Sequence, residues 1–560
     1  MFALFSFRSC TFFVQDFFFI MGKYIKDHFS LLEHQVDAVK GLVSRRRAVL
    51  VDSVGNGKTM ECLYGYSYLR HKGLVDFAIV LTPKNAYDKR VWEEDARKHT
   101  HLKCISFDDV IRKMDLGDTV ESLSKQYDFI YAKHTHCKTA YDYLRRWYVC
   151  KGLRLLSVVD ELHVVRNPKA ALTQAMRLLM GGTYALWGIT ATILSKSCMD
   201  TYNIINFVYP RYFPSYRMFQ QEFCRVEDKV VGRKPDGSLR RVSTVTDYKD
   251  VGALQKYCDG VLVAGVSSVP ISYHLWEYEM SPEEASLYSL IARGLCGGSD
   301  DMDDESWLRS VLSGDIGDAG IKTVKDLQRH SSRFMYLQSV VNGALGLDGV
   351  FGLYGSRKVD RLLDLCREIA SRNESALIYC ETYTSIDVLF YFLSKSGIVD
   401  GRGRAVSVAE QSGRRSQEVT RGMCMSRSTF VLISKAKTES ANWTFVNNAI
   451  LFDIPTVPST IIQFVGRIQR RSSEHLGNLH AWYLHSNDIS EYKMRLSGSK
   501  IYFQEGIAFD VNSFPREYIK AMESASNLRA AKQYLLWADR SIVDKGRGRK
   551  LGGLVQKSLF

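Results

Sequence analysis

The sequence lacks several patterns that would place it in a class at once. None of its 12 cysteines belongs to a Cys-x-x-Cys pair, which argues against a zinc ribbon or a thioredoxin-like site. Scattered single thiols fit a reducing cytoplasmic compartment, and we expect no structural zinc. No apolar run approaches the roughly 20 residues that cross a bilayer, so no membrane segment is expected.

The first residues are rich in phenylalanine, but Arg8 and Asp16 interrupt them. A basic start, a continuous apolar centre and a small-residue cleavage site are missing, so no signal peptide is predicted. Met21 opens a more ordinary stretch, and we expect that it is the true start. Residues 1–22 are therefore treated as a doubtful extension.

The composition is that of a folded soluble protein, with 46% hydrophobic and 24% charged residues. These values exclude disorder, collagen and coiled coil as the main description. There are 75 Lys and Arg against 61 Asp and Glu, giving a net charge of +14. This excess favours a polyanionic partner such as nucleic acid, although a merely basic enzyme fits equally well. A length of 560 residues suggests three or four domains, or two large ones with insertions.

Short apolar strands alternate with amphipathic helices in two parts of the chain. The predicted strands are 48–51, 77–81, 155–159 and 185–189 in the first part, and 376–379, 430–433 and 449–452 in the second. Several end in polar residues, which is typical of parallel sheets that bind ligands at their carboxyl ends. The predicted fold class is α/β, with two parallel-sheet units of similar size.

A glycine-rich loop follows the first predicted strand. Gly55 and Gly57 allow backbone N–H groups to point at a phosphate, and the following helix adds its positive N-terminus. Lys58 would reach the β- and γ-phosphates, and the Thr59 hydroxyl would bind Mg²⁺. The strict GxxxxGK[ST] pattern fails at its first position, where Asp52 stands. The remaining loop residues of the predicted ATP site are Ser53, Val54 and Asn56.

Two further groups carry the chemistry of phosphoryl transfer. Asp160 and Glu161 follow a buried strand, where the first can hold Mg²⁺ and the second can polarise the attacking water. Arg467 and Arg470 lie three residues apart, which predicts one face of a helix. Their guanidinium groups would stabilise the charge of the γ-phosphate in the transition state.

A basic hairpin is predicted near residues 225–248, with Pro-Asp-Gly as its turn. We expect its arms to contact duplex phosphates, although a solvated hairpin is about as consistent. The basic residues of the arms are Arg233, Lys234, Arg240 and Arg241.

Taken in order, these motifs resemble the superfamily 2 helicases and translocases, in particular the SWI/SNF-type branch and its annealing-helicase-like members. The resemblance covers about residues 31–490. Its most specific stretch is DELHVVRNPK at 160–169, and it also includes LTPKNAYDKRVWEED at 81–95, with Trp92 and Glu94. A compact motor of this kind fits a virus, phage or bacterium.

The resemblance implies two RecA-like lobes in tandem, with ATP and Mg²⁺ bound in the cleft between them. It implies that Gln35 contacts the adenine base, that Gln463 faces the nucleotide, and that Thr190 and Thr192 couple hydrolysis to movement. The implied domains are lobe 1 at 23–265, a helical linker at 266–350, lobe 2 at 351–495, and an extension with a basic tail at 496–560.

Two departures from the family pattern concern coupling. Val261, Leu262 and Val263 stand where an arginine pair is usual. The loop after the strand at 430–433 lacks its usual glycines, although Lys435 and Lys437 can still meet DNA phosphates.

These features predict a cytoplasmic, monomeric, ATP-dependent translocase on duplex DNA. An RNA-directed helicase of the same superfamily is an alternative, against which the Asn-Pro-Lys stretch argues. A non-hydrolysing DNA-binding scaffold is a third, against which the full set of ATP-site residues argues.

Overall fold

The computed structural model divides the chain into two compact units, and each is considered by itself. The first contains Met1–Val226 and Val245–Ser267, and the second contains Glu227–Thr244 and Ser268–Phe503. The described residues are 23–26, 31–52, 55–143, 153–191, 193, 199–233, 239–264, 271–294, 303–315, 334–415, 417–434, 443–469, 477–486, 488–490 and 493–494. The predicted extension at 1–22 and the basic tail lie outside them.

The first unit is built on a seven-stranded sheet in which every pairing is parallel. Its strands, in spatial order, are β3 (Cys104–Ser106), β4 (Phe129–Lys133), β2 (Phe77–Thr82), β5 (Leu155–Asp160), β6 (Ala185–Thr190), β1 (Arg47–Val51) and β9 (Leu262–Ala264). The four strands predicted for this part of the chain are all present. Leu262 and Val263, two of the three residues that stand in place of the usual arginine pair, lie in the edge strand β9 beside β1.

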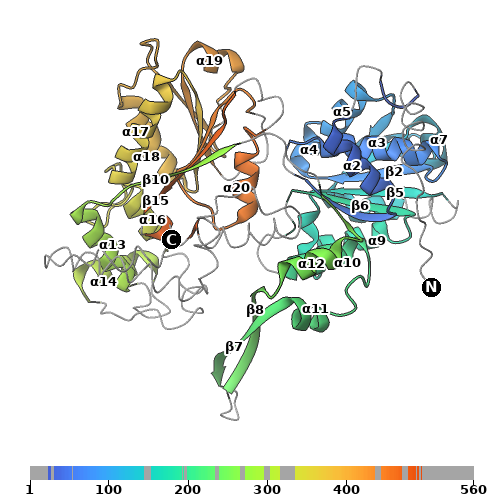
Figure 1. The fold of residues 1–560 in the computed structure, drawn as a ribbon, viewed down its shortest axis with the longest axis horizontal. Coiled ribbons are helices and arrows are strands. Elements are labelled where there is room, and N and C mark those ends of the chain that lie inside the picture. Colours follow the sequence, from blue (N-terminus) through green and yellow to red (C-terminus); the bar gives the residue numbers. More distant parts are fainter. Residues whose placement is uncertain are drawn as a thin grey trace. The chain divides into compact units, whose positions relative to one another are not determined.

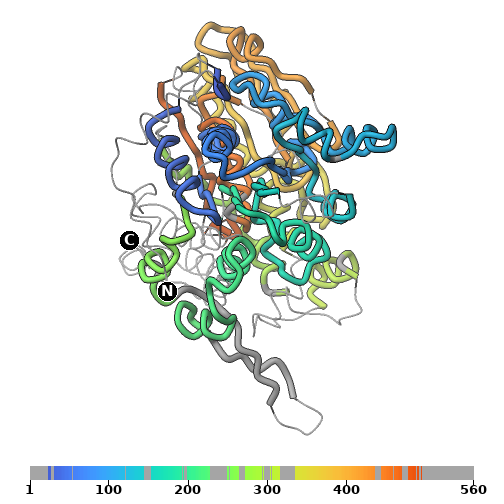
Figure 2. Tube along the Cα trace, turned by 90° about the vertical axis from the view of Figure 1, so that its right-hand side faces the viewer, coloured from blue at the N-terminus to red at the C-terminus, as the bar shows by residue number. Residues whose placement is uncertain are grey.

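Helices surround this sheet, and the course of the chain from blue to green can be followed in Figure 2. They are α2 (Glu33–Val43), α3 (Lys58–His71), α4 (Lys84–Asp88), α5 (Val91–His99), α6 (Phe107–Asp115), α7 (Val120–Gln126), α9 (Ala171–Met180), α10 (Met199–Val208), α11 (Tyr216–Phe223) and α12 (Val251–Cys258). The short 3-10 helices η1 (His134–His136) and η2 (Leu162–Arg166) follow β4 and β5. Alternate residues of the central strands form one core with α2, α3 and α5.

The second unit has a six-stranded sheet, again wholly parallel. Its order is β10 (Ser272–Glu277), β15 (His480–His485), β14 (Asn448–Leu451), β11 (Ala376–Cys380), β13 (Thr429–Ser434) and β12 (Ser407–Gln411). The α/β prediction is confirmed for both units. Strand β10 falls in the stretch predicted as a linker. It joins the sheet because it pairs with β15, some 200 residues later.

Both faces of the second sheet are covered, as Figure 1 shows. The helices are α13 (Pro282–Gly294), α14 (Asp304–Ser313), α16 (Phe334–Val341), α17 (Arg357–Ser371), α18 (Tyr383–Lys395), α19 (Arg421–Ser426) and α20 (Pro458–Val465). Along β11, Ile378 packs in the core with α17 and α18, whereas Leu377 and Tyr379 pack in the core with α20. This alternation follows from the two-residue period of a strand.

A separate two-stranded sheet pairs β7 (Cys224–Arg233) with β8 (Leu239–Tyr248). These strands lie on either side of the predicted Pro-Asp-Gly turn, which itself is outside the described residues. Among the helices that the structure describes, none is both long and apolar enough to cross a membrane.

A buried charged network joins the helices of the second unit to the ends of β11 and β14. Lys358 is fully buried, and its ammonium donates to Asn342 Oδ1 at 3.0 Å and lies 3.9 Å from Asp453. Asp453 also accepts from the amides of Asn342 at 2.7 Å and Gln338 at 3.1 Å, and from the Glu381 backbone N–H at 2.8 Å. Burial lowers the pKa of Lys358, and the carboxylate of Asp453 opposes that effect.

Replacing Lys358 by Met should lower the free energy of unfolding by about 3 kcal/mol, because it leaves the Asp453 carboxylate buried without its cation. Adding Asp453→Asn should restore part of the loss. Urea unfolding followed by circular dichroism measures both effects. Lys395→Met, on an exposed face of α18, is the control and should change stability by less than about 0.5 kcal/mol. A K358M variant as stable as the control would contradict the role of this network.

Candidate nucleotide site

The glycine-rich loop connects β1 to α3 at the carboxyl edge of the first sheet. Gly55 and Gly57 both have φ of 91°, a conformation that side chains other than glycine rarely adopt. Gly57 is the N-cap of α3, so the free N–H groups of that helix begin at Lys58. Ser53 and Val54 lie outside the described residues.

Asp52 organises this loop. Its carboxylate accepts from the Asn56 amide at 2.7 Å, and its carbonyl accepts from the Lys58 ammonium at 3.0 Å. Its own N–H donates to the carbonyl of Thr190 at 3.2 Å. The aspartate that breaks the strict sequence pattern is therefore the residue that closes the loop and attaches it to β6.

Gln35 supports the loop from α2. Its side-chain amide donates to the carbonyl of Asn56 at 2.7 Å and accepts from the N–H of Leu32 at 3.0 Å. A Cβ atom on Gly57 would lie only 2.4 Å from the Gln35 amide nitrogen, so a side chain there would displace the Gln35 amide. Contact of Gln35 with an adenine stays a prediction.

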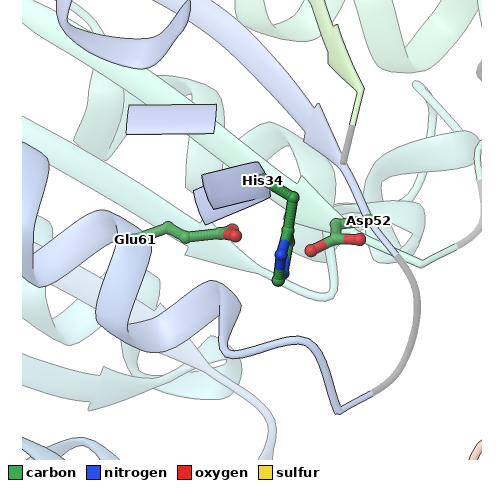
Figure 3. Close-up of side chains that lie close together, drawn as sticks. All are labelled: His34, Asp52 and Glu61. Atoms are coloured by element: carbon green, nitrogen blue, oxygen red, sulfur yellow. The ribbon is translucent and has the colours of Figure 1, made fainter. Parts of the chain in front are cut away.

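Two buried acids and a histidine meet behind the loop, as Figure 3 shows. The side chains of Glu61 and Asp52 point toward the ring of His34, and their potential ligand atoms all lie within 4.8 Å of one another. Burial and the neighbouring Asp52 raise the pKa of Glu61 to about 9. This raised pKa keeps Glu61 protonated at neutral pH, so it lies beside the Asp52 carboxylate as a neutral acid.

Asp160 ends β5 beside the loop. Its carboxylate accepts from the Thr82 hydroxyl at 2.9 Å and from the Trp92 indole at 3.3 Å. Burial and then Glu161 raise the pKa of Asp160 to about 6, while Lys58 acts in the opposite direction. Carboxylate and hydroxyl oxygens are the ligands that Mg²⁺ prefers, so Asp160 and Thr59 fit that ion.

Glu161 has a left-handed backbone, with φ of 50°, at the start of η2. Such a conformation is costly for a residue other than glycine and is frequent at functional sites. Its carboxylate lies 3.1 Å from the ring of His163. Gly188 of β6 lets η2 pack closely, since a Cβ there would lie 2.2 Å from Leu162.

His134 forms a second contact to this turn. Its Nε2 lies 2.8 Å from the Asp160 carbonyl. Burial lowers the pKa of His134 to about 4, so the ring is neutral at pH 7. No local pattern connects His134 with Asp160, because the two residues are 26 positions apart, one in η1 and the other at the end of β5. Trp92, in contrast, could be identified from the sequence, because it lies in the motif at 81–95.

The predicted coupling residues are only partly described. Thr190 is fully buried at the end of β6, where its carbonyl holds Asp52. Thr192 lies outside the described residues. Coupling by these two threonines stays a prediction.

In the second unit, α20 carries Gln463, which is buried. The helix ends at Val465, so the prediction that Arg467 and Arg470 share a helix face is wrong for Arg467. Gly466 is the C-cap, and the Arg467 carbonyl accepts from the Trp443 N–H at 3.2 Å instead of continuing the helix. Arg470 is outside the described residues.

For the residues predicted to contact nucleic acid, the structure gives at most the strand on which each one lies. Arg233 ends β7, and Arg240 and Arg241 lie on β8. Lys234, Lys435 and Lys437 are outside the described part of the chain.

Residues 34–269 match the family described as the SNF2-related domain. An ATP-dependent helicase of Bacillus subtilis, YqhH, is 21% identical over 86% of this chain and 80% of its own length. The predicted relation to the SWI/SNF-type ATPases of superfamily 2 is confirmed.

Similarity also extends to a larger protein and to a solved structure. The ATP-dependent DNA helicase DDM1 of Arabidopsis thaliana is 23% identical over 79% of this chain, which spans 57% of that relative. A SWI2/SNF2 ATPase core of Sulfolobus solfataricus, solved with dsDNA, has a TM-score of 0.35 at 17% identity and covers 91% of this chain and 98% of its own.

The raised pKa of Glu61 predicts a pH-dependent stability. The unfolded chain releases this proton near pH 4.5 and the folded chain only near 9, so unfolding becomes easier as pH rises between these values. The slope should approach about 1.4 kcal/mol per pH unit. Glu61→Gln keeps a neutral side chain and should remove that slope, giving a variant that gains on the wild type from pH 6 to 8.

Urea unfolding at pH 6, 7 and 8 measures these slopes. Glu121→Gln, on the exposed side of α7, is the matched control and should keep the wild-type slope. Parallel slopes for wild type and E61Q would show that Glu61 is ionised in the folded protein.

Proposed function

We propose that this chain is an ATP-dependent translocase that hydrolyses ATP when bound to nucleic acid and moves along duplex DNA. The observation that carries the proposal is the position of Lys58 and Asp160 at the carboxyl edge of one parallel sheet, close enough for the ammonium to act on the carboxylate. The SNF2-related domain supports the same reading.

In this proposal, the N–H groups of the loop and of the first turn of α3 bind the phosphates, with Lys58 as their counter-charge. The Thr59 hydroxyl and the Asp160 carboxylate hold Mg²⁺, which supplies positive charge to the phosphates when bound. Thr82 and Trp92 orient Asp160 for that task. A pKa of about 6 leaves Asp160 ionised at neutral pH.

Glu161 is the proposed base that orients the attacking water. Its left-handed backbone turns the chain sharply after Asp160, so that adjacent residues take different roles. From the second unit, Gln463, Arg467 and Arg470 are proposed to complete the site. Hydrolysis would then require both units.

Duplex DNA is proposed as the track. The net charge of +14 supports a polyanionic partner. The names of DDM1, a DNA helicase, and of the Sulfolobus core solved with dsDNA point to the same partner. Basic residues of β7, β8 and the turn between them, with Lys435 and Lys437, are proposed to contact phosphates.

The central test compares ATP hydrolysis without nucleic acid and with duplex DNA, single-stranded DNA or RNA. We expect the largest stimulation with duplex DNA. Glu161→Gln should lower the stimulated rate at least 100-fold while retaining ATP binding, because it removes the base but not the phosphate contacts. Lys58→Ala should lower the rate of hydrolysis and should also weaken ATP binding.

Other outcomes of this hydrolysis assay would favour one of the two alternative functions. Stimulation by RNA alone would favour an RNA helicase, and no hydrolysis under any condition would favour a binding scaffold. Glu121→Gln, an exposed residue of α7 outside the motifs, is the control for Glu161→Gln and should retain the wild-type rate.

The basic hairpin gives a separate prediction. Its four basic residues are Arg233, Lys234, Arg240 and Arg241. Changing all four to Ala should flatten the dependence of duplex binding on salt concentration, because fewer counterions are released on binding. Fluorescence anisotropy measures the change in slope, over a salt range of roughly 50 to 200 mM. An unchanged slope would remove the hairpin from the interface.

A further inference from the structure

A basic cavity of about 880 Å³ lies in the first unit, away from the nucleotide loop. It is lined by Arg47 and Leu186, which face each other across β1 and β6 at the beginning of both strands. The loop instead follows the far ends, where Val51 pairs with Thr190. At about 3.3 Å per residue, the length of β1 separates the two places.

The charge of this cavity is of one sign. Four cations line it, and no acidic residue is among the described residues that do so. The four are Arg47, Lys169, Arg177 and Arg211. None of them forms an ion pair within the described part of the chain, although Arg47 donates to the Val208 carbonyl at 2.7 Å. Uncompensated cations around a cavity attract an anion.

Aromatic rings form another part of the wall. Tyr202 stacks on Phe213, with ring centroids 5.9 Å apart and planes inclined by 29°. Tyr216 meets Tyr202 edge-on at 5.5 Å, and its side chain is 48% exposed. Arg211, on the rim, has a left-handed φ of 65°, which is strained for a residue with a side chain.

We propose that this cavity binds a segment of single-stranded DNA, separately from the duplex track of the translocase. Cations beside exposed aromatic rings are the usual means of holding single strands, because phosphates meet the charges and bases stack on the rings. A duplex keeps its bases stacked inside, so it cannot use the tyrosines. A volume of this size is sufficient for one or two nucleotides.

The test measures binding of a fluorescein-labelled oligo-dT of about 12 nucleotides to the full chain without ATP, by anisotropy. Arg177→Glu with Arg211→Glu should weaken binding at least tenfold. The control, Arg112→Glu with Lys125→Glu, makes the same charge change at residues 75% and 76% exposed outside the cavity, and should weaken it less than twofold. Equal losses in both variants would overturn the site.

A second variant separates stacking from charge. Tyr216→Ala should weaken oligo-dT binding about fivefold, whereas Tyr209→Ala, which is 43% exposed and outside the cavity, should not. Photo-cross-linking of 4-thiothymidine oligonucleotides should label peptides containing Tyr202 or Tyr216, which reports on the site without any substitution. Labelling confined to other peptides would overturn the proposal.

Competition identifies the ligand class. Unlabelled oligo-dT should displace the probe, and polyglutamate of equal charge should not; equal displacement would assign the cavity to an acidic peptide instead. Duplex-stimulated ATP hydrolysis should stay within twofold of wild type in R177E/R211E and Y216A. Loss of that stimulation alongside oligo-dT binding would place the cavity on the duplex track and overturn its separate role.

Discussion

The nucleotide site depends on the hydrogen bonds of one residue, Asp52. Its side chain, carbonyl and N–H bind Asn56, Lys58 and Thr190, so the loop, the start of α3 and the end of β6 are fixed through a single position. A parallel sheet makes this possible because β1 and β6 end at the same edge. The fold therefore sets the position of Lys58.

Holding a carboxylate at that position has an electrostatic consequence. Glu61 enters the same buried space from the first turn of α3. Two ionised acids there would repel each other, because little water is present to screen them. A proton on Glu61 removes this repulsion, so burial and the neighbouring Asp52 raise the pKa of Glu61. The same principle acts at Asp160, where Thr82, Trp92 and Lys58 oppose the effects of burial and of Glu161.

The sequence predicted what local pattern determines. Apolar runs with polar ends became the parallel strands β1, β2, β5 and β6, because their alternation with helices permits few other arrangements. It did not predict features set by contacts between distant residues. The neutral state of Glu61 needs Asp52 nearby, and β10 needs β15. The Arg467 carbonyl, just beyond the end of α20, accepts from the distant Trp443 N–H.

The cavity at the beginning of β1 and β6 is another feature that is set by contacts between distant residues. Its cations come from positions as far apart as Arg47 and Arg211, so no short motif contains them. Packing explains why they are close: α10 lies against β1 and η2, and the chain after it brings Phe213 onto Tyr202. Unpaired cations so close together repel one another, and an anion bound among them relieves that repulsion. The two edges of one sheet would then hold two different phosphate-bearing ligands.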